Sequence, residues 1–273
     1  MATQLGFHAE RLKAVAALRT VRGRRASRRF TFEGTTLLAE ANAAGTPPEE
    51  LYVTQEAYDA APLVRELERL GVPTFIVDPS SVARLSDVAT PSGVVAVAPQ
   101  RLWSPDKAFM GAALSVVLAD VGDPANAGTI LRSAEAFGCT TAIFGSLGVD
   151  PYHPKVVRGS MGAVFRLRLV VCEPPGLAAA AAACGVRVLG LAAEGTPLEG
   201  HEWSFPSALV TGHERRGLGR WRYLCEGLLG IPMRGRAESL SAAVAAAIAL
   251  YQASHAMACQ ESVQGPKSQD YRR

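Results

Sequence analysis

A buried strand that passes through a short turn into a helix constrains the fold of this chain more than any other feature. Residues Ala112–Ala119 form an apolar run of strand length, which is typical of a strand buried on both faces of a parallel sheet. After Asn126 the apolar residues follow helical spacing as far as Gly138, a natural helix stop. We therefore expect the turn that carries Asp123 and Asn126 at the carboxyl edge of a sheet, where open α/β sheets bind ligands.

Taken alone, this stretch is explained as well by a tight strand-to-helix connection with a surface arginine, Arg132. Two later stretches, residues 208–218 and 231–241, change that interpretation. Together with residues 126–132 they resemble the three motifs of the SpoU (TrmH) family of RNA ribose 2′-O-methyltransferases. The motifs occur in the family's order and at its separations, and the resemblance covers nearly all of the chain.

Composition excludes several other classes. Of 273 residues, 48% are hydrophobic and 19% charged, so the chain can form a core and global disorder is not expected. The five cysteines include no Cys-x-x-Cys pair, and the five histidines form no metal-spaced pair, so we expect a reducing compartment and no metal site. The N-terminus lacks an apolar signal core, and the apolar stretch Ala242–Leu250 is too short to span a bilayer. We therefore expect a cytoplasmic protein.

The chain is expected to form two α/β domains. Strands and helices alternate between residues 30 and 98, and a proline-containing linker follows at residues 99–111. The phrases Phe-Glu-Gly and Val-Val-Ala-Val look like the substrate-binding domain of the SpoU family, which is similar to the L30e fold. The resemblance thus implies an L30e-like RNA-binding domain at residues 11–98 and a SPOUT methyltransferase domain at residues 112–262. It also implies a trefoil knot in the C-terminal part and an obligate homodimer, neither of which composition could suggest.

Some local features of the two domains are also predicted. Residues 1–10 and 263–273 are expected to be flexible. We expect Gly23 to interrupt the first helical segment and residues 164–172 to form a strand. An alanine-rich final helix at residues 239–258 should pack closely against the sheet or a partner subunit.

A run of basic residues near the N-terminus predicts a polyanionic partner. Residues 11–29 contain eight cations and no acidic residue. A solvated basic face is the ordinary explanation of such a run, but the missing counter-charge favours contacts with RNA phosphates. The arginines expected to bind RNA, one of them from the second domain, are Arg19, Arg22, Arg24, Arg25, Arg28, Arg29 and Arg158.

The chain lacks both a Gly-x-Gly-x-x-Gly fingerprint after a strand and a P-loop. It has instead two turns flanked by apolar residues, at Thr211-Gly-His-Glu and Ile231-Pro-Met. Apolar walls and exposed backbone groups suit the adenine of S-adenosylmethionine, although strand-end packing explains the residues equally well. The resemblance implies that the cofactor pocket is lined by Thr211, Gly212, Ile231, Met233 and Leu240.

The resemblance also assigns the catalytic residues. In the family the arginine that matches Arg132 is the proposed activator of the ribose hydroxyl. A guanidinium stays protonated, so it cannot act as a base. We therefore expect Arg132 to hold a substrate phosphate and to favour reaction of the hydroxyl through its positive charge. We expect Asn126 to orient Arg132 or the ribose, Glu214 to hold Arg132 or its neighbours, and Ser239 to close the site. The reaction needs no metal, because positive sulfur already activates the leaving group.

One residue departs from the family pattern. The third motif usually reads Ser-Leu-Asn, whereas this chain has Ser241 in place of the asparagine. This departure leaves open an alternative function, a non-catalytic RNA-binding or ribosome-assembly protein. The basic segment argues against a third possibility, an α/β enzyme acting on small molecules. The leading hypothesis is ribose 2′-O-methylation of RNA, with 23S rRNA as the favoured substrate. Protection of the ribosome from an antibiotic is a specialised role that the sequence does not decide.

Overall fold

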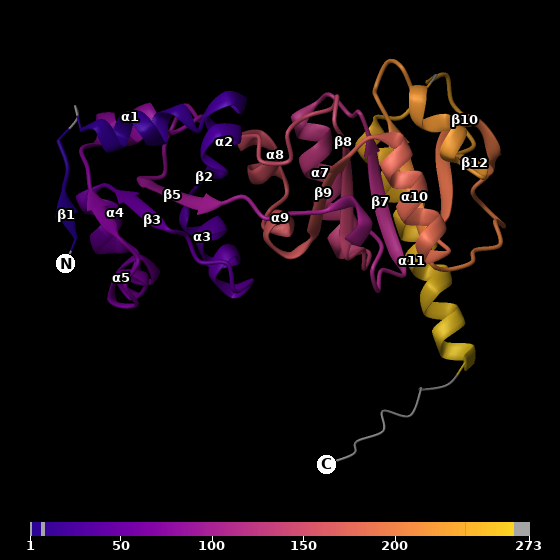
Figure 1. The fold of residues 1–273 in the computed structure, drawn as a ribbon, viewed down its shortest axis with the longest axis horizontal. Coiled ribbons are helices and arrows are strands. Elements are labelled where there is room, and N and C mark those ends of the chain that lie inside the picture. Colours follow the sequence, from indigo (N-terminus) through magenta and orange to yellow (C-terminus); the bar gives the residue numbers. More distant parts are fainter. Residues whose placement is uncertain (1, 7–8, 238, 265–273) are drawn as a thin grey trace, which may run out of the picture. The chain divides into compact units, whose positions relative to one another are not determined.

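The computed structural model describes residues 2–6, 9–237 and 239–264. The chain divides into two compact units (Figure 1). Unit 1 comprises Met1–Leu102 and Asp150–Arg166, and unit 2 comprises Trp103–Val149 and Leu167–Arg273. Residues 265–273 and part of the N-terminal segment, which were predicted to be flexible, lie outside the described residues. Both units are mixed α/β, as predicted.

Unit 1 is built on a five-stranded sheet of order β1-β4-β3-β5-β2. Strands β1, β4 and β3 are parallel, and β5 runs antiparallel to both β3 and β2. The strands are β1 (Thr3–Gln4), β2 (Arg29–Glu33), β3 (Glu50–Val53), β4 (Thr74–Ile76) and β5 (Val94–Pro99). The helices are α1 (Glu10–Ala17), α2 (Val21–Ser27), α3 (Thr35–Ala43), α4 (Gln55–Ala60), α5 (Pro62–Arg69), α6 (Pro79–Leu85), α8 (Pro154–Gly159) and α9 (Ala163–Arg166).

The segment Asp150–Arg166, with helices α8 and α9, belongs to unit 1 although it connects two strands of unit 2. The sequence-based boundaries placed it in the second domain. Aromatic packing explains its position: the rings of Phe30 and Tyr152 lie 4.5 Å apart, and those of Phe32 and Phe165 lie 5.0 Å apart in an edge-to-face arrangement. Such long-range contacts leave no local signal in the sequence.

The first basic segment forms two helices, and the break lies before the predicted position. Helix α2 begins after Thr20, whose hydroxyl accepts a hydrogen bond from the Gly23 backbone N–H at 3.1 Å. Gly23 itself lies inside α2. A Cβ at Gly23 would lie 2.0 Å from the carbonyl oxygen of Ala17, so this glycine allows close packing instead of ending the helix.

Unit 2 contains a seven-stranded sheet of order β12-β10-β11-β7-β8-β9-β6. All pairs from β12 to β9 are parallel. The strands are β6 (Leu102–Trp103), β7 (Leu114–Ala119), β8 (Thr141–Gly145), β9 (Arg168–Cys172), β10 (Arg187–Pro197), β11 (Ser207–Gly212) and β12 (Gly227–Gly230). The strand predicted at residues 164–172 is therefore shorter, because its first residues belong to α9.

Helices cover the sheet of unit 2, whose central strand β7 is buried along its whole length. The helices are α7 (Pro124–Ala136), α10 (Pro174–Cys184) and α11 (Ala242–Gln264), with 3-10 helices η1 (Pro105–Lys107) and η2 (Gly219–Leu224). Helix α11 packs against α7 and β11 through a stripe of small residues that includes Ala246, Ala249 and Ala253.

Helix α11 is longer than the apolar stretch recognised in the sequence. Residues Ala242–Gln260 are, by length and composition, apolar enough to cross a membrane. Core helices of water-soluble proteins meet the same criterion, so one such helix is weak evidence for a membrane span. Its buried alanines instead show that one side of α11 packs within unit 2.

The order of the strands brings the three sequence motifs together. Strand β7 lies between β11 and β8: the chain passes from β7 to β8 and β9 on one side and then places β10, β11 and β12 on the other side, so the strand order reverses at β7. The turns after the parallel neighbours β7 and β11 emerge at the same edge. Strand β12 ends at this edge too, beside β10. Ligands bind at such switch points in open α/β sheets.

Candidate active site at the carboxyl edge of the second sheet

Glu214, in the turn after β11, joins two of the predicted motifs. Its carboxylate accepts hydrogen bonds from Asn126 Nδ2 at 2.9 Å and from the backbone N–H groups of Gly122 at 3.2 Å and Asp123 at 3.3 Å. Burial acts to raise the pKa of Glu214, but these donors, with Asn126 foremost, outweigh burial and lower the pKa. Glu214 is therefore an ionised carboxylate that fixes the turn before α7.

The start of α7 explains why this turn has a defined shape. Asp123 is the N-cap residue, and its carboxylate accepts a hydrogen bond from the Ala125 backbone N–H at 2.8 Å. Pro124 occupies the first helical position, where its missing N–H costs nothing. The cap sets the direction of the first turn of α7, from which Asn126 reaches Glu214.

Arg132 is not brought to the other predicted catalytic residues. It lies nearly two turns after Asn126 on α7 and is exposed. Within the described part of the chain, Arg132 makes no hydrogen bond or ion pair, and it is not among the residues that line the neighbouring cavity. Asn126 thus contacts Glu214 and not Arg132 in this structure.

A cavity of about 420 Å³ opens beside Glu214 at the same edge of the sheet. All five residues predicted to bind the cofactor line this cavity, as do Glu214 and Ser239. The predicted cofactor residues are Thr211, Gly212, Ile231, Met233 and Leu240. The structure brings these residues together, and their contact with a cofactor stays a prediction.

Gly212 is required by the shape of the loop that walls the cavity. A Cβ at Gly212 would lie 2.3 Å from the backbone carbon and oxygen of Gly217. This close approach comes from a small antiparallel bridge, in which His213 and Gly217 exchange backbone hydrogen bonds at 2.9 and 2.8 Å. Any side chain at residue 212 would separate the two backbone segments.

Several residues that line the cavity were missed by the sequence analysis. They come from the middle of β10, from the loop before η2, from η2 itself, from β12 and from the start of α11. The residues are Leu191, Ala192, Ala193, Glu194, His213, Arg216, Gly217, Leu218, Gly219, Arg222, Leu229, Ala242 and Ala245. The apolar run of β10 was visible, but nothing in the sequence showed that β10 lies next to β12 and reaches the site.

Ser241, the departure from the family pattern, has a structural role. Its hydroxyl accepts a hydrogen bond from the Val244 backbone N–H at 3.3 Å, and its carbonyl accepts one from Ala245 at 3.0 Å. Ser241 is thus positioned as a cap at the start of α11. Serine and asparagine are about equally good in this position, so the departure leaves the helix start intact.

The predicted RNA-binding arginines of unit 1 fall into two groups. Arg24 is fully buried and forms an ion pair with Asp150 at 2.8 Å, while donating to the Leu18 and Arg19 carbonyl oxygens. Its guanidinium is occupied inside unit 1 and cannot contact an RNA phosphate, which corrects the prediction for this residue. Arg29 is likewise paired, with Glu49 at 2.9 Å and Glu50 at 2.7 Å.

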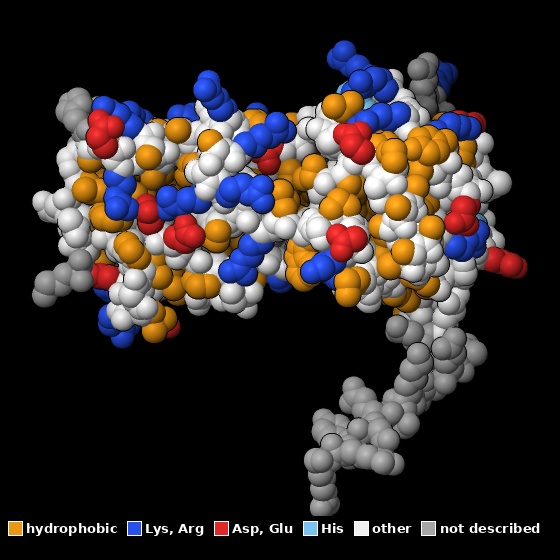
Figure 2. All heavy atoms as spheres, viewed as in Figure 1, with side chains coloured by type: hydrophobic (Ala, Val, Ile, Leu, Met, Phe, Trp, Pro, Cys, Tyr) orange, Lys and Arg blue, Asp and Glu red, His pale blue; other side chains and the backbone are white. Residues whose placement is uncertain are grey.

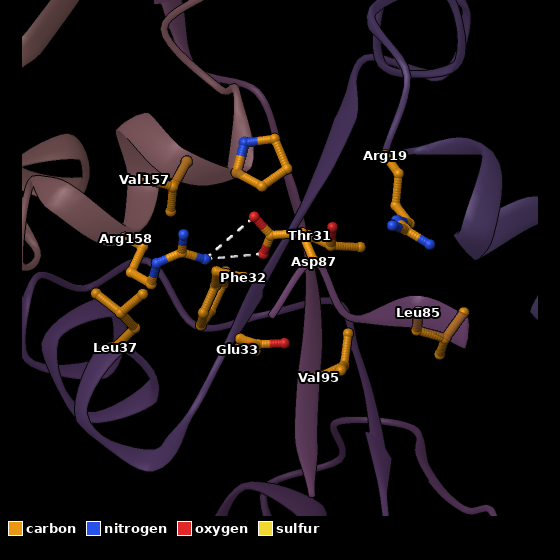
Figure 3. A pocket seen from close by; sticks show the side chains of 11 residues that line it. Arg19, Thr31, Phe32, Glu33, Leu37, Leu85, Asp87, Val95, Val157 and Arg158 are labelled. Atoms are coloured by element: carbon orange, nitrogen blue, oxygen red, sulfur yellow. Dashed lines mark hydrogen bonds and ion pairs between the residues drawn. The ribbon is translucent and has the colours of Figure 1, made fainter. Parts of the chain in front are cut away.

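The other predicted arginines remain at the surface. Arg22, Arg25 and Arg28 are exposed, and Lys and Arg side chains gather on the visible face of this unit (Figure 2). Arg19 is exposed and donates to the Arg84 carbonyl oxygen at 3.1 Å. Arg158 is partly exposed and binds both carboxylate oxygens of Asp87, at 3.0 and 3.1 Å (Figure 3).

Arg19 and Arg158 lie at a small hollow in unit 1, which also contains Glu33 (Figure 3). Burial raises the pKa of Glu33, Ser86 acts against this by hydrogen bonding, and Asp87 adds to it. Glu33 therefore lies beside the ion pair of Asp87 and Arg158, which has a structural role in unit 1. No group of histidine, cysteine or carboxylate side chains within the described residues could hold a metal ion.

Comparisons with known proteins match both units. The chain matches the SpoU rRNA Methylase family over residues 113–251 and the MRM3-like substrate binding domain over residues 9–96. It is 28% identical to the 23S rRNA (guanosine(2553)-2'-O)-methyltransferase RlmP of Bacillus subtilis, over 89% of this chain and 95% of that protein. It is 32% identical to an uncharacterized tRNA/rRNA methyltransferase of Mycobacterium ulcerans, over 83% of this chain and 79% of that protein.

A solved structure supports the same assignment. The SpoU methyltransferase AviRb from Streptomyces viridochromogenes, in complex with the cofactor AdoMet, aligns with a TM-score of 0.83 and 29% sequence identity. The alignment covers 92% of this chain and 99% of that chain. The similarity therefore extends over both units.

Proposed function

This chain belongs to the SpoU rRNA methylase family, and we propose that it transfers a methyl group from S-adenosylmethionine to a ribose 2′-oxygen of 23S rRNA. The observation that carries the proposal is the cavity at the carboxyl edge of the unit 2 sheet, beside the Glu214–Asn126 contact. Residues of the second and third motifs line this cavity, and Asn126 of the first motif binds Glu214 at its edge. The relatives named for 23S rRNA and for AdoMet binding support this substrate and cofactor.

The residues around the cavity fit S-adenosylmethionine. Ile231, Met233 and Leu240 offer apolar surface for an adenine ring, and the close approach at Gly212 keeps backbone groups near the ligand. The bound cofactor would supply a methyl carbon that is activated by positively charged sulfur. Because this carbon is already activated, the chain needs to contribute no metal ion.

The protein has to orient the ribose and to promote loss of the 2′-hydroxyl proton. The 2′-hydroxyl must lose a proton to solvent or to a basic group as the new oxygen–carbon bond forms. The Arg132 guanidinium stays protonated, so it stabilises the negative charge that develops on the oxygen and holds a neighbouring phosphate. Glu214 and Asn126 fix the turn from which α7 presents Arg132, and Ser239 closes the cavity.

Unit 1 is proposed to bind the RNA substrate, in line with its match to a substrate binding domain. Its exposed arginines Arg19, Arg22, Arg25 and Arg28 contact phosphates. These contacts provide affinity without base choice, because base edges are not read by phosphate contacts. The arginines engaged in buried or half-buried ion pairs stabilise unit 1 instead.

The active form is proposed to be a homodimer. Helix α11 exposes Val244 and Tyr251, which are seven residues apart and therefore lie on the same side of the helix, at 46% and 55% exposure. Arg132 projects from α7, the helix that packs on α11, without a partner in the described part of the chain. A second copy that covers this surface would bring Arg132 to a cavity.

Two further properties complete the proposal. The C-terminal segment that lines the cavity is proposed to be threaded in a trefoil knot, as in the SPOUT fold. The protein is proposed to be cytoplasmic, where ribosomal RNA is available and where the five free cysteines stay reduced. The non-catalytic alternative rested on Ser241, whose hydroxyl caps α11. The relatives named as rRNA 2'-O-methyltransferases favour the catalytic function, and the transfer assay decides between the two.

The test is transfer of labelled methyl groups from S-adenosylmethionine to ribosomal RNA, with transfer RNA assayed in parallel. Substrates should include naked 23S rRNA, intact large subunits and subunits stripped of proteins, because ribosomal proteins and RNA folding change which nucleotides an enzyme can reach. We expect label in one rRNA species and none in transfer RNA. Absence of transfer to every rRNA form, from protein that binds the cofactor, would contradict the proposal.

A further inference from the structure

Asp120, the residue that follows β7, accepts four hydrogen bonds from three residues in two separate segments of unit 2. Its carboxylate accepts hydrogen bonds from Arg220 Nε at 2.9 Å and Nη2 at 3.2 Å, from Trp221 Nε1 at 2.9 Å and from the Leu147 backbone N–H at 3.2 Å. Burial acts to raise its pKa, but Arg220 and Trp221 outweigh burial and lower the pKa. Asp120 is only 7% exposed and is ionised at neutral pH.

The surrounding backbone is shaped around this carboxylate. Asp120 has a φ of 57°, a left-handed conformation that is strained for a residue other than glycine. A Cβ at Gly145 would lie 2.2 Å from Asp120 Oδ1 and 2.8 Å from the Trp221 ring. A Cβ at Gly148 would lie 3.0 Å from Asp120 Cα. Two glycines and a strained conformation thus make room for one buried carboxylate.

Arg220 extends the same network to other elements. Its guanidinium also forms an ion pair with Glu173, which precedes α10, and donates to Ser146 Oγ at 3.3 Å. Trp221 is 1% exposed and packs in the core beneath. The start of η2 is therefore held by ionic, hydrogen-bonding and apolar contacts together.

The contacts of Asp120 and those of Glu214 anchor the same loop, residues 214–220, at its two ends. The short turn after β7 binds Glu214 through the Gly122 and Asp123 N–H groups and binds Arg220 through Asp120. It therefore holds both ends of the loop at residues 214–220. Between these ends, residues 216–219 form one wall of the cavity.

We infer that Asp120 and Arg220 are positioning residues of the cofactor pocket, which fix residues 216–219 in the conformation that binds S-adenosylmethionine. The inference rests on the proposed function for the identity of the ligand. Neither residue lines the cavity, so both act through the loop. Loss of the Arg220 contacts leaves Trp221 as the remaining anchor at the distal end of the loop and loosens residues 216–219, while Glu214 still holds the other end. Cofactor affinity should therefore fall, while RNA affinity stays near that of the wild type.

The test compares cofactor binding by wild type, Arg220→Ala, Arg220→Lys and Arg187→Ala. Arg187 is a matched control, since this partly exposed arginine on β10 pairs with Glu226 and Ser204 but does not line the cavity. The dissociation constant for S-adenosylmethionine is measured by calorimetry, and KM is measured separately for cofactor and RNA. Thermal unfolding is recorded for each variant.

We expect Arg220→Ala to raise the cofactor dissociation constant and KM by about tenfold, with KM for RNA within about twofold of wild type. Arg220→Lys should show about a threefold effect, because lysine keeps the charge but loses the two-pronged contact with Asp120. Arg187→Ala should bind the cofactor as wild type does. If Arg220→Ala does not fold, the comparison of cofactor dissociation constants is made with Arg220→Lys.

Wild-type cofactor affinity in a folded Arg220 variant would overturn the inference, even if its melting temperature fell. An equal loss in Arg187→Ala would also overturn it, because the effect would then follow from any lost surface ion pair. Failure of the proposed function looks different: the wild type itself would then bind no S-adenosylmethionine.

Discussion

Glu214 shows how a single carboxylate organises the proposed active site. Its side chain retains 25% of its exposure to solvent and accepts three hydrogen bonds, two of them from backbone N–H groups in the turn before α7. Charge-assisted bonds of this kind are about twice as strong as neutral ones. The sequence predicted a brace between Glu214 and Arg132 or its neighbours, and the partner in the structure is Asn126.

Glu214→Gln should lower kcat/KM for methyl transfer by about 10- to 100-fold, because an amide accepts the backbone N–H groups more weakly than a carboxylate. The measurement is transfer from labelled S-adenosylmethionine to rRNA. Glu226→Gln is the control, since Glu226 is exposed and, among the described residues, forms its ion pair with Arg187, which lies at the end of β10 away from the cavity. Equal activity of both variants would show that Glu214 is dispensable.

The same residue predicts a dependence of stability on pH. The folded-state pKa of Glu214 is lowered from the ordinary value of 4.5, so its stabilisation is fully present above that value. It is lost as the pH falls through the lowered folded-state pKa. The difference in unfolding free energy between wild type and Glu214→Gln should therefore shrink when the pH is lowered from 6 towards 3. A constant difference over this range would contradict the assignment.

Gly212→Ala tests the close approach at the cavity wall. The added Cβ would collide with the Gly217 backbone, and such overpacking costs about 1–3 kcal/mol. We expect a lower melting temperature and cofactor binding weakened by at least about tenfold. Gly235→Ala is the matched control because a Cβ there meets nothing within 4 Å. A fully active Gly212→Ala would show that the loop adapts.

At the scale of elements, the sequence predicted most strands and helices but not which of them are neighbours. The apolar run at residues 112–119 contains the central strand β7, and the predicted turns at Gly212 and Ile231 lie at the ends of β11 and β12. Strand β12 itself was not predicted. Periodicity reports only local structure. It could not reveal that residues 150–166 pack in unit 1, that Arg24 is buried or that β10 contributes to the cavity.

Helix α2 carries arginines of two kinds, which leads to opposite expectations for two substitutions. Arg24→Ala leaves the carboxylate of Asp150 without its buried partner, which costs about 3–5 kcal/mol. Arg25→Ala removes an exposed charge and should leave stability unchanged, while it weakens RNA binding and reduces its salt dependence. Chemical unfolding and RNA binding at several salt concentrations distinguish the two. Equal loss of stability in both would contradict this division.

At the scale of the whole molecule, the site depends on association if the homodimer proposal holds. Tyr251→Glu places a charge on the exposed side of α11, and we expect a monomer with severely reduced methyl transfer. Leu70→Glu changes an exposed leucine of unit 1 in the same way and should have no effect on either property. Analytical ultracentrifugation measures the association. An active monomer would exclude a shared site.

The central claim is that the chain methylates one ribose 2′-oxygen and that Arg132 assists this step. The most direct test is to locate the ribose that becomes resistant to alkaline hydrolysis after 23S rRNA is treated with enzyme and S-adenosylmethionine. We predict one protected position with the wild type and loss of at least about 100-fold in rate with Arg132→Ala, while cofactor binding is kept. A methyl group on a base, or full activity of Arg132→Ala, would contradict the account.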